Sequence, residues 1–160
     1  MKVYHASYCV IEHPDISFSR EKLDFGKGFY VTTILNQAER LCEKFKRKNQ
    51  EAFVNKYELD ELRFQDPEIK IKRFDAYNSE WLDYVAKCRK GDDVYKQYDI
   101  VIGGVANDKI FATIDAFFAG YMNKEMALDK LKYEKPNQQI CFLNQIFLNQ
   151  TLTFVEADKR

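Results

Sequence analysis

The 160-residue sequence is poor in several residue types that mark whole classes of protein. It has 3 Pro and 6 Gly, too few for a collagen-like, low-complexity or disordered chain. Its 25 basic residues are balanced by 25 acidic residues, so no overall positive excess favours non-specific binding to nucleic-acid backbones. No run of about 18 uncharged apolar residues occurs, so the sequence predicts no membrane-spanning segment.

Cysteine is also scarce, and its spacing excludes two common uses. The four cysteines (Cys9, Cys42, Cys88 and Cys141) include no Cys-x-x-Cys pair and no nearby His pair, which argues against a zinc site and against a disulfide framework. Each is expected to pack as a small hydrophobe. The first residues lack the apolar stretch of a secretory signal. We therefore expect a cytoplasmic protein that holds no metal.

Hydrophobic and aromatic residues are abundant, at 46% and 15% of the chain. A chain of this length buries around 70% of the surface that its unfolded form exposes, so it needs no metal or disulfide to hold a core. No internal repeat or linker divides the sequence. We expect one domain over residues 1–160.

Strand and helix patterns alternate irregularly along the chain. β-Branched and aromatic runs predict strands at residues 3–11, 29–33, 52–59, 68–74, 99–105, 139–143 and 151–155. Apolar residues at three- and four-residue steps predict helices beginning at residue 36 and covering residues 78–90, 108–121 and 124–133. Because the two kinds of element do not alternate regularly, an α+β fold with a mixed sheet is expected rather than a continuous parallel sheet.

Few residues suit a known catalytic motif. The sequence has no Gly-x-Ser-x-Gly elbow and no Walker loop. Of the two histidines, His13 precedes Pro14 in a predicted turn and carries little functional weight. His5 lies in an apolar strand, where it is either a half-buried structural imidazole or a group that projects into a cleft. Gly103-Gly104 suits either a phosphate-binding turn or a tight connection from strand to helix.

The most distinctive motif is the block Asp24–Thr33, D-F-G-K-G-F-Y-V-T-T, with His5-Ala6-Ser7 before it and Asn137–Phe142, N-Q-Q-I-C-F, near the end. Together these segments resemble the core of the ADP-ribosyltransferases, closest to the branch of the poly-ADP-ribose polymerases and diphtheria-type toxins. That branch carries a His, a Tyr and usually a Glu on three separate strands. His5, Tyr30 and Gln139 stand at the corresponding places.

The resemblance implies an ADP-ribosyltransferase-like fold that takes NAD as substrate and transfers ADP-ribose to a cytosolic macromolecule. It implies catalytic roles for His5, Tyr30 and Gln139. The implied cofactor-binding residues are His5, Ala6, Ser7, Gly28, Phe29, Tyr30 and Gln138. The phenol ring of Tyr30 would stack on the nicotinamide, His5 would bond a ribose hydroxyl, and the Ala6 backbone would pair with the nicotinamide amide.

The chain resembles still more closely a family of small bacterial proteins that share D-F-G-x-G-F-Y-x-T. Such proteins are often parts of toxin–antitoxin or phage-defence loci. The resemblance therefore implies a toxin, with an antitoxin protein as its partner.

Three positions depart from the polymerase pattern. An amide, Gln139 or its neighbour Gln138, replaces the carboxylate, and an amide neither takes a proton nor offsets positive charge. Ala38 replaces a serine, and Leu41 replaces a second stacking tyrosine. These departures leave open a catalytically degenerate module that binds a nucleotide or a partner protein. A phosphotransferase acting on RNA ends is a weaker alternative, because it needs several arginines near its cleft.

The same residues also have purely structural interpretations. Tyr30 could be a tyrosine of the core, and Gln139 could lie on the solvent-exposed side of an edge strand. Asp24 could cap the turn before the glycines. The functional hypothesis requires instead that His5, Tyr30 and Gln139 converge on one dinucleotide-sized hollow.

Overall fold

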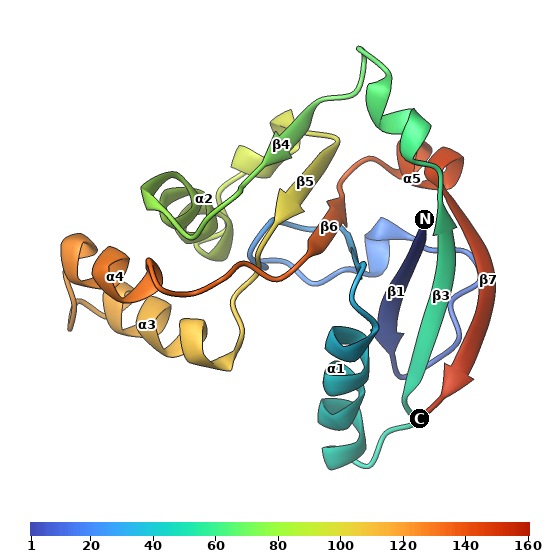
Figure 1. The fold of residues 1–160 in the computed structure, drawn as a ribbon, viewed down its shortest axis with the longest axis horizontal. Coiled ribbons are helices and arrows are strands. Elements are labelled where there is room, and N and C mark those ends of the chain that lie inside the picture. Colours follow the sequence, from blue (N-terminus) through green and yellow to red (C-terminus); the bar gives the residue numbers. More distant parts are fainter.

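The computed structural model describes residues 1–160 as an α+β fold with one seven-stranded mixed sheet and five α-helices (Figure 1). This confirms the predicted fold class. The strands are β1 (Lys2–Ser7), β2 (Phe29–Thr32), β3 (Phe53–Leu59), β4 (Ile71–Arg73), β5 (Ile100–Gly103), β6 (Gln139–Phe142) and β7 (Leu152–Lys159). The α-helices are α1 (Leu35–Arg47), α2 (Ser79–Arg89), α3 (Asp108–Phe118), α4 (Lys124–Leu131) and α5 (Gln145–Thr151). Short 3₁₀ helices are η1 (Ile16–Phe18), η2 (Glu61–Gln65) and η3 (Val94–Gln97).

The strand order of the sheet is β4-β5-β6-β2-β1-β3-β7. Only β4 and β5 run parallel, and the connection between them contains α2; all the other neighbours are antiparallel. In the middle of the sheet, β2 lies between β1 and β6, which come from opposite ends of the chain. This order brings side by side the three strands that carry His5, Tyr30 and Gln139.

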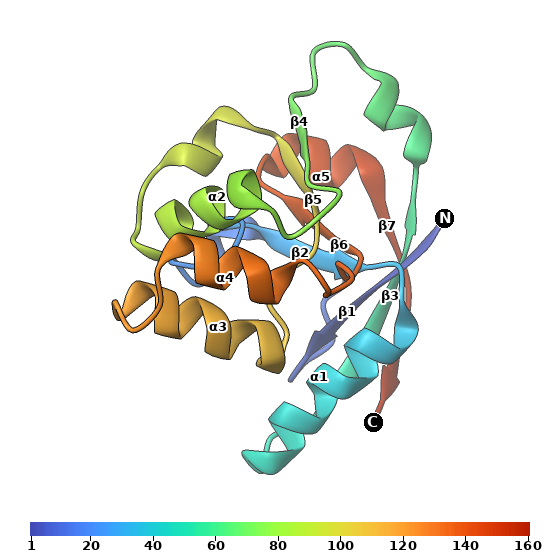
Figure 2. The ribbon, with the colours of Figure 1, turned by 60° about the vertical axis from the view of Figure 1, so that its left-hand side comes forward.

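Helices cover both faces of the sheet. Alternation along the strands places Ala6, Tyr30, Thr32, Val101, Gln139 and Cys141 on one face, which we call the helical face. Helix α1 packs on its β1–β3 part, and α2, α3 and α4 form a separate layer over β5 and β6 (Figure 2). The opposite face, which we call the α5 face, carries Val3, Phe29, Val31, Ile100, Ile140 and Phe142 against Phe147 and Leu148 of α5.

Local sequence signals explain two of the helices. In α1, the buried Ala38 and Cys42 stand four residues apart and face the sheet, while the last turn carries Lys44, Lys46 and Arg47. In α2, Asn78 and not Ser79 is the cap, because its side chain accepts a hydrogen bond from the Trp81 amide. Gly91 follows this helix with φ +85°, as expected of a terminating glycine.

Several element boundaries differ from the prediction. The first strand ends at Ser7 rather than Ile11, because the chain turns and the Cys9 amide donates to the Ser7 hydroxyl. The strand predicted at residues 68–74 shrinks to β4, because Asp66 holds the Glu68 and Ile69 amides in a turn. Helix α5 is not predicted, although the Asn144 side chain caps it by accepting from the Ile146 and Phe147 amides.

The strand predicted at residues 151–155 begins at Leu152 and continues to Lys159, because it pairs with β3 along its whole length at the edge of the sheet. The two helices between β5 and β6 each end two or three residues earlier than predicted. All four cysteines are free, and Cys42, Cys88 and Cys141 are buried. None of the helices has the length and apolar character needed to cross a bilayer.

Candidate functional site

The candidate site is built on an interruption between β1 and β2. The two strands share a single ladder pair, Tyr4 with Thr32. Beyond it, β1 continues to Ser7 and β2 extends back to Phe29 without further pairing. We call this stretch, in which Ala6 stands opposite Tyr30, the seam.

The other edge of β1 determines which backbone groups face the seam. Met1 and Leu59 of the β1–β3 ladder exchange both backbone hydrogen bonds, at 2.9 and 2.7 Å. Because orientation alternates along an antiparallel ladder, His5 directs its N–H and C=O groups to β3, and Ala6 directs its own toward β2. The Ala6 backbone therefore faces the seam and has no ladder partner there. A backbone donor and acceptor side by side are complementary to a carboxamide group.

The His5 imidazole bridges the seam. Its Nδ1 lies 2.6 Å from the carbonyl oxygen of Tyr30, and its ring stacks on Phe29 with centroids 4.3 Å apart. A carbonyl oxygen only accepts, so Nδ1 carries the proton and donates. Burial lowers the pKa of His5 below its ordinary value, and the hydrogen bond to Tyr30 opposes this in part. The ring is therefore neutral at pH 7, and its Nε2 is a hydrogen-bond acceptor.

The Nε2 atom of His5 is not fully buried. His5 is only partly buried, and Nε2 has no hydrogen-bond partner in the chain. The hydroxyl of Tyr84 is the one fully buried side-chain polar atom without a partner, so Nε2 is not enclosed. The structure thus leaves one acceptor of fixed tautomer at the seam.

The Tyr30 hydroxyl already makes two hydrogen bonds within the chain. It donates to the Gly26 carbonyl at 2.6 Å and accepts from the Phe25 amide at 3.1 Å, so it fastens the preceding turn. Burial is the largest cause that raises the pKa of Tyr30 well above its ordinary value, so the phenol stays neutral. What this residue can offer a ligand is the partly exposed ring, not the hydroxyl.

Gln139 lies on the far side of β2 from β1. As the first residue of β6 it stands opposite Thr32, on the same face as Tyr30. Its half-buried side chain donates from Nε2 to Oε1 of Gln37 at 3.0 Å. Gln138 precedes the strand and is exposed.

The three predicted catalytic residues thus lie on adjacent strands but not on one face. Tyr30 and Gln139 belong to the helical face, whereas alternation assigns His5 to the α5 face, from which its ring reaches the seam. A hollow of about 580 Å³ lies between α4 and Ser79 of α2, another of about 570 Å³ lies between α3 and α4, and neither includes these residues. In the first, Lys124 and Lys132 form ion pairs with Asp83 and Asp129, and in the second Lys109 pairs with Glu134.

The remaining predicted cofactor contacts are mostly core positions. Ala6 packs against Ala38 of α1, and Phe29 is 6% exposed. The Ser7 hydroxyl is buried and accepts from the Cys9 amide at 3.3 Å. A Cβ on Gly28 would lie 2.5 Å from the carbonyl oxygen of Phe142, so this glycine allows β6 to approach closely.

Two residues of the D-F-G-K-G-F-Y block, Asp24 and Gly26, have structural roles. Asp24 does not cap its own turn: its carboxylate accepts from Nε of Arg89 at 2.7 Å and from the Ala106 amide at 2.8 Å. Gly26 has φ +94°, and a Cβ there would overlap the Tyr95 ring. The block locks the start of β2 to α2 and to the segment that follows β5.

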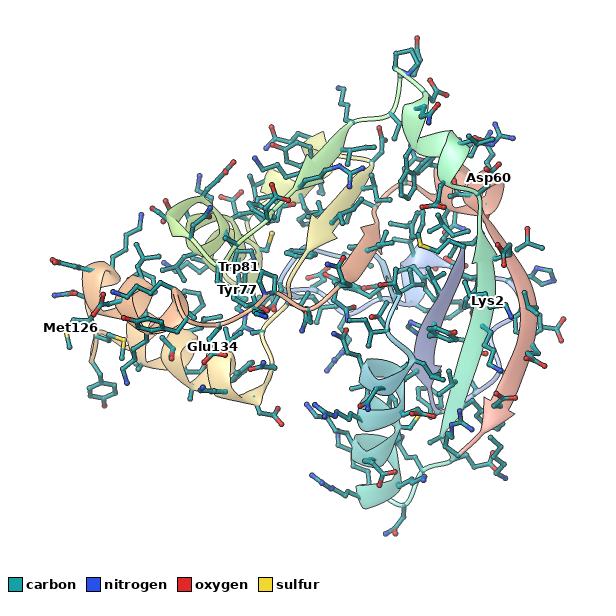
Figure 3. All side chains as sticks on the ribbon, viewed as in Figure 1. Lys2, Asp60, Tyr77, Trp81, Met126 and Glu134 are labelled. Atoms are coloured by element: carbon teal, nitrogen blue, oxygen red, sulfur yellow. The ribbon has the colours of Figure 1, made fainter.

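That segment, residues 103–107, is held from several directions. Trp81 Nε1 donates to the Gly104 carbonyl at 2.7 Å, and the Asn137 side chain bonds both the N–H and the C=O of Val105, at 2.8 and 3.0 Å. Tyr77 packs beside Trp81 and also donates to the Val105 carbonyl (Figure 3). Since the amides of Val105 and Ala106 are occupied, the Gly103-Gly104 turn serves as a tight connection and not as a phosphate cradle.

Sequence reasoning missed three polar residues around the site: Thr32, Gln37 and Asn55. Asn55 stands opposite His5 in β3, is fully buried, and bonds the Cys9 carbonyl and the Ile11 amide. It shapes the chain that follows Ser7. The signal available in the sequence was a polar Asn within the strand predicted at residues 52–59. Nowhere do three or more His, Cys, Asp or Glu side chains gather in a way that could hold a metal ion.

A protein-family profile described as "Protein of unknown function (DUF3990)" matches residues 1–154. No curated protein and no solved structure matches the chain.

Proposed function

This chain belongs to the family described as a protein of unknown function (DUF3990), and we propose that it is an NAD-dependent ADP-ribosyltransferase-like protein that modifies a cytosolic macromolecule. The observation that carries the proposal is the seam. The Ala6 backbone and Nε2 of His5 lie on β1 at the seam, and the Gln139 amide lies on β6, on the other side of β2. Their order along the chain is that of the ADP-ribosyltransferase resemblance, with Gln139 in place of the usual Glu.

Each group has a place in the proposed reaction. The bond between the nicotinamide nitrogen and the ribose C1′ breaks, and its electron pair leaves with nicotinamide. An acceptor nucleophile then bonds to C1′, and its proton passes to water. The Ala6 N–H and C=O would hold the carboxamide, and Nε2 of His5 would accept from a ribose hydroxyl. Such positioning of the reacting groups is a large part of the rate acceleration in enzymes.

In our proposal the enzyme is slow compared with transferases that carry a Glu, because position 139 is an amide. Its carbonyl oxygen can accept from a ribose hydroxyl, but it does not carry the charge that would stabilise a cationic C1′. Losing one electrostatic group of this kind typically costs about 10²–10³ in rate. The same amide favours the second candidate function, a degenerate module that binds NAD without cleaving it. Gln138, exposed beside it, would contact the rim of the bound dinucleotide.

Cell extract incubated with the protein and NAD tests this proposal. We expect release of nicotinamide and a mass increment of one ADP-ribose on an acceptor, both lost in His5→Ala and retained in the control His13→Ala, whose histidine is exposed in a turn. At NAD concentrations of about 100 times Kd, binding should stabilise the fold by about 2.7 kcal/mol. Stabilisation without nicotinamide release indicates the binding module, and the absence of both refutes the NAD site.

The proposed biological setting is that of a toxin held in check by an antitoxin protein. Expression of the wild-type chain should then arrest growth of a bacterial host, and His5→Ala should relieve the arrest at equal protein level. Growth unaffected by the wild-type chain would contradict the toxin role and leave the enzymatic proposal to the assay above.

A further inference from the structure

A chain of hydrogen bonds connects Gln139 to the first turn of α1. The Ile34 amide donates to Oγ1 of Thr32 at 3.1 Å, and Oγ1 of Thr32 donates to Oε1 of Gln37 at 2.8 Å. Nε2 of Gln139 donates to the same Oε1 at 3.0 Å. The three side chains come from β2, α1 and β6, so three separate elements meet at one amide oxygen.

The donors and acceptors in this series of hydrogen bonds follow from the single hydrogen of the Thr32 hydroxyl. Oγ1 of Thr32 already accepts from the Ile34 amide, and its single hydrogen is left to donate. Thr32 is 4% exposed, so water has little access to compete for that hydrogen. In the structure this hydrogen is donated to Oε1 of Gln37, and the same oxygen receives the Gln139 NH₂ group.

The consequence is a defined orientation for Gln139. With its NH₂ group bound to Gln37, its own carbonyl oxygen has no hydrogen-bond partner in the chain and is not fully buried. A free glutamine side chain samples many rotamers and both orientations of its amide. Here the exposed atom is an acceptor, which suits a ligand hydroxyl and not a ligand carbonyl or phosphate.

We propose that Gln37 is a positioning residue that orients Gln139 to accept a hydrogen bond from a ribose hydroxyl of NAD. This inference rests on the proposed function for its ligand. The contact between the two glutamines does not depend on the ligand, so the two ideas can fail separately.

Variants of Gln37 test the contact in the intact chain. Gln37→Met keeps the length of the side chain without an acceptor, whereas Gln37→Glu keeps the acceptor. Gln50→Met, at an exposed glutamine whose side chain makes no hydrogen bond, is the matched control. We expect kcat/KM for nicotinamide release to fall about tenfold in Gln37→Met, as after loss of one well-placed hydrogen bond. In Gln37→Glu it should remain within about threefold of wild type.

A double-mutant cycle separates positioning from a merely structural role. If Gln37 acts through Gln139, then Gln37→Met combined with Gln139→Ala is no worse than Gln139→Ala alone. Additive losses would overturn the proposal, and so would an equally poor Gln37→Glu.

A second readout needs no NAD. In ¹⁵N-labelled protein, the side-chain NH₂ signal that disappears in Gln139→Ala should be protected from solvent exchange in wild type and unprotected in Gln37→Met. Protection that persists in Gln37→Met would overturn the positioning role. A wild-type chain that shows this dependence but neither binds nor cleaves NAD would refute the proposed function alone.

Discussion

Replacing Tyr30 by phenylalanine separates the two roles that this residue is given by sequence and by structure. The substitution keeps the aromatic ring, which the resemblance assigns to the nicotinamide, and removes the hydroxyl, which the structure assigns to the turn at Phe25 and Gly26. Phe25 is fully buried and Gly26 is buried as well, so water cannot replace the lost oxygen. One backbone N–H and one backbone C=O are left without a partner.

The expected cost follows from these two groups. Leaving a buried polar group unsatisfied costs about 1–3 kcal/mol, so the loss of both partners in Tyr30→Phe should lower the free energy of unfolding by about 2–6 kcal/mol. For a chain of this size, that loss corresponds to a fall in Tm of roughly 4–24 °C. Tyr121→Phe is the control, because Tyr121 is 87% exposed and its hydroxyl makes no hydrogen bond; its cost should stay within about 0.5 kcal/mol.

Urea unfolding followed by circular dichroism measures both variants. A Tyr30→Phe chain as stable as Tyr121→Phe would refute the reasoning that the hydroxyl fastens the turn. At a temperature where the variant is folded, NAD should bind with a Kd within about threefold of wild type, since the ring remains. A large loss of affinity in a fully folded variant would instead place the hydroxyl in ligand contact.

Three further predictions concern charge, protonation and packing. Gln139→Glu should raise nicotinamide release by about 10²-fold if the chain is a slow transferase, because it adds the missing negative charge; unchanged turnover, measured by chromatography of nicotinamide, would support the binding module. Since burial lowers the pKa of His5, the unfolded chain binds the extra proton first, and stability should fall as pH drops below about 6.5. Urea midpoints between about pH 5 and 8 should show a flatter acid-side fall in His5→Gln, and identical profiles would contradict the assignment. Gly28→Ala should lower the free energy of unfolding by about 3 kcal/mol or more, because its Cβ meets the Phe142 carbonyl oxygen at 2.5 Å. Gly120 has open space around it but a φ of +81°, so Gly120→Ala should lower the free energy of unfolding by only about 1–2 kcal/mol in the same urea assay. Equal losses at the two glycines would show that close approach to β6 is not the limiting feature.

Much of the fold was accessible from the sequence because its signals are local. The apolar spacing of α1, the Asn78 cap and the Gly91 stop of α2 each depend on residues within one or two turns. Helix α5 was missed because its seven residues read as part of a polar connection between two strands. The premature end of β1 depends on Asn55, which lies 46 residues from Cys9 and was not identifiable as its partner.

The site was predictable only in part, because its geometry depends on which strands are neighbours. The resemblance selected His5, Tyr30 and Gln139, and the sheet order does bring their strands together. It could not reveal that the Tyr30 hydroxyl bonds the backbone of the preceding turn, since the sequence shows a tyrosine but not the partners of its hydroxyl. Nor could it assign Asp24, whose partners Arg89 and Ala106 lie 65 and 82 residues away.

The segment that contains α3 and α4 connects the end of β5 at Gly103 to the start of β6 at Gln139. These two residues are paired in the β5–β6 ladder. Its two ends are therefore already closed by the ladder and by the bonds between Val105 and Asn137. Lengthening or shortening the segment changes little of the closure entropy, since that grows only slowly with loop length. The helical pair is nevertheless anchored, because Ile110 and Ile114 of α3 and Leu131 of α4 belong to the buried core that they share with α2 and β5. Changes of length are therefore expected in the connections of this segment and not on its buried faces.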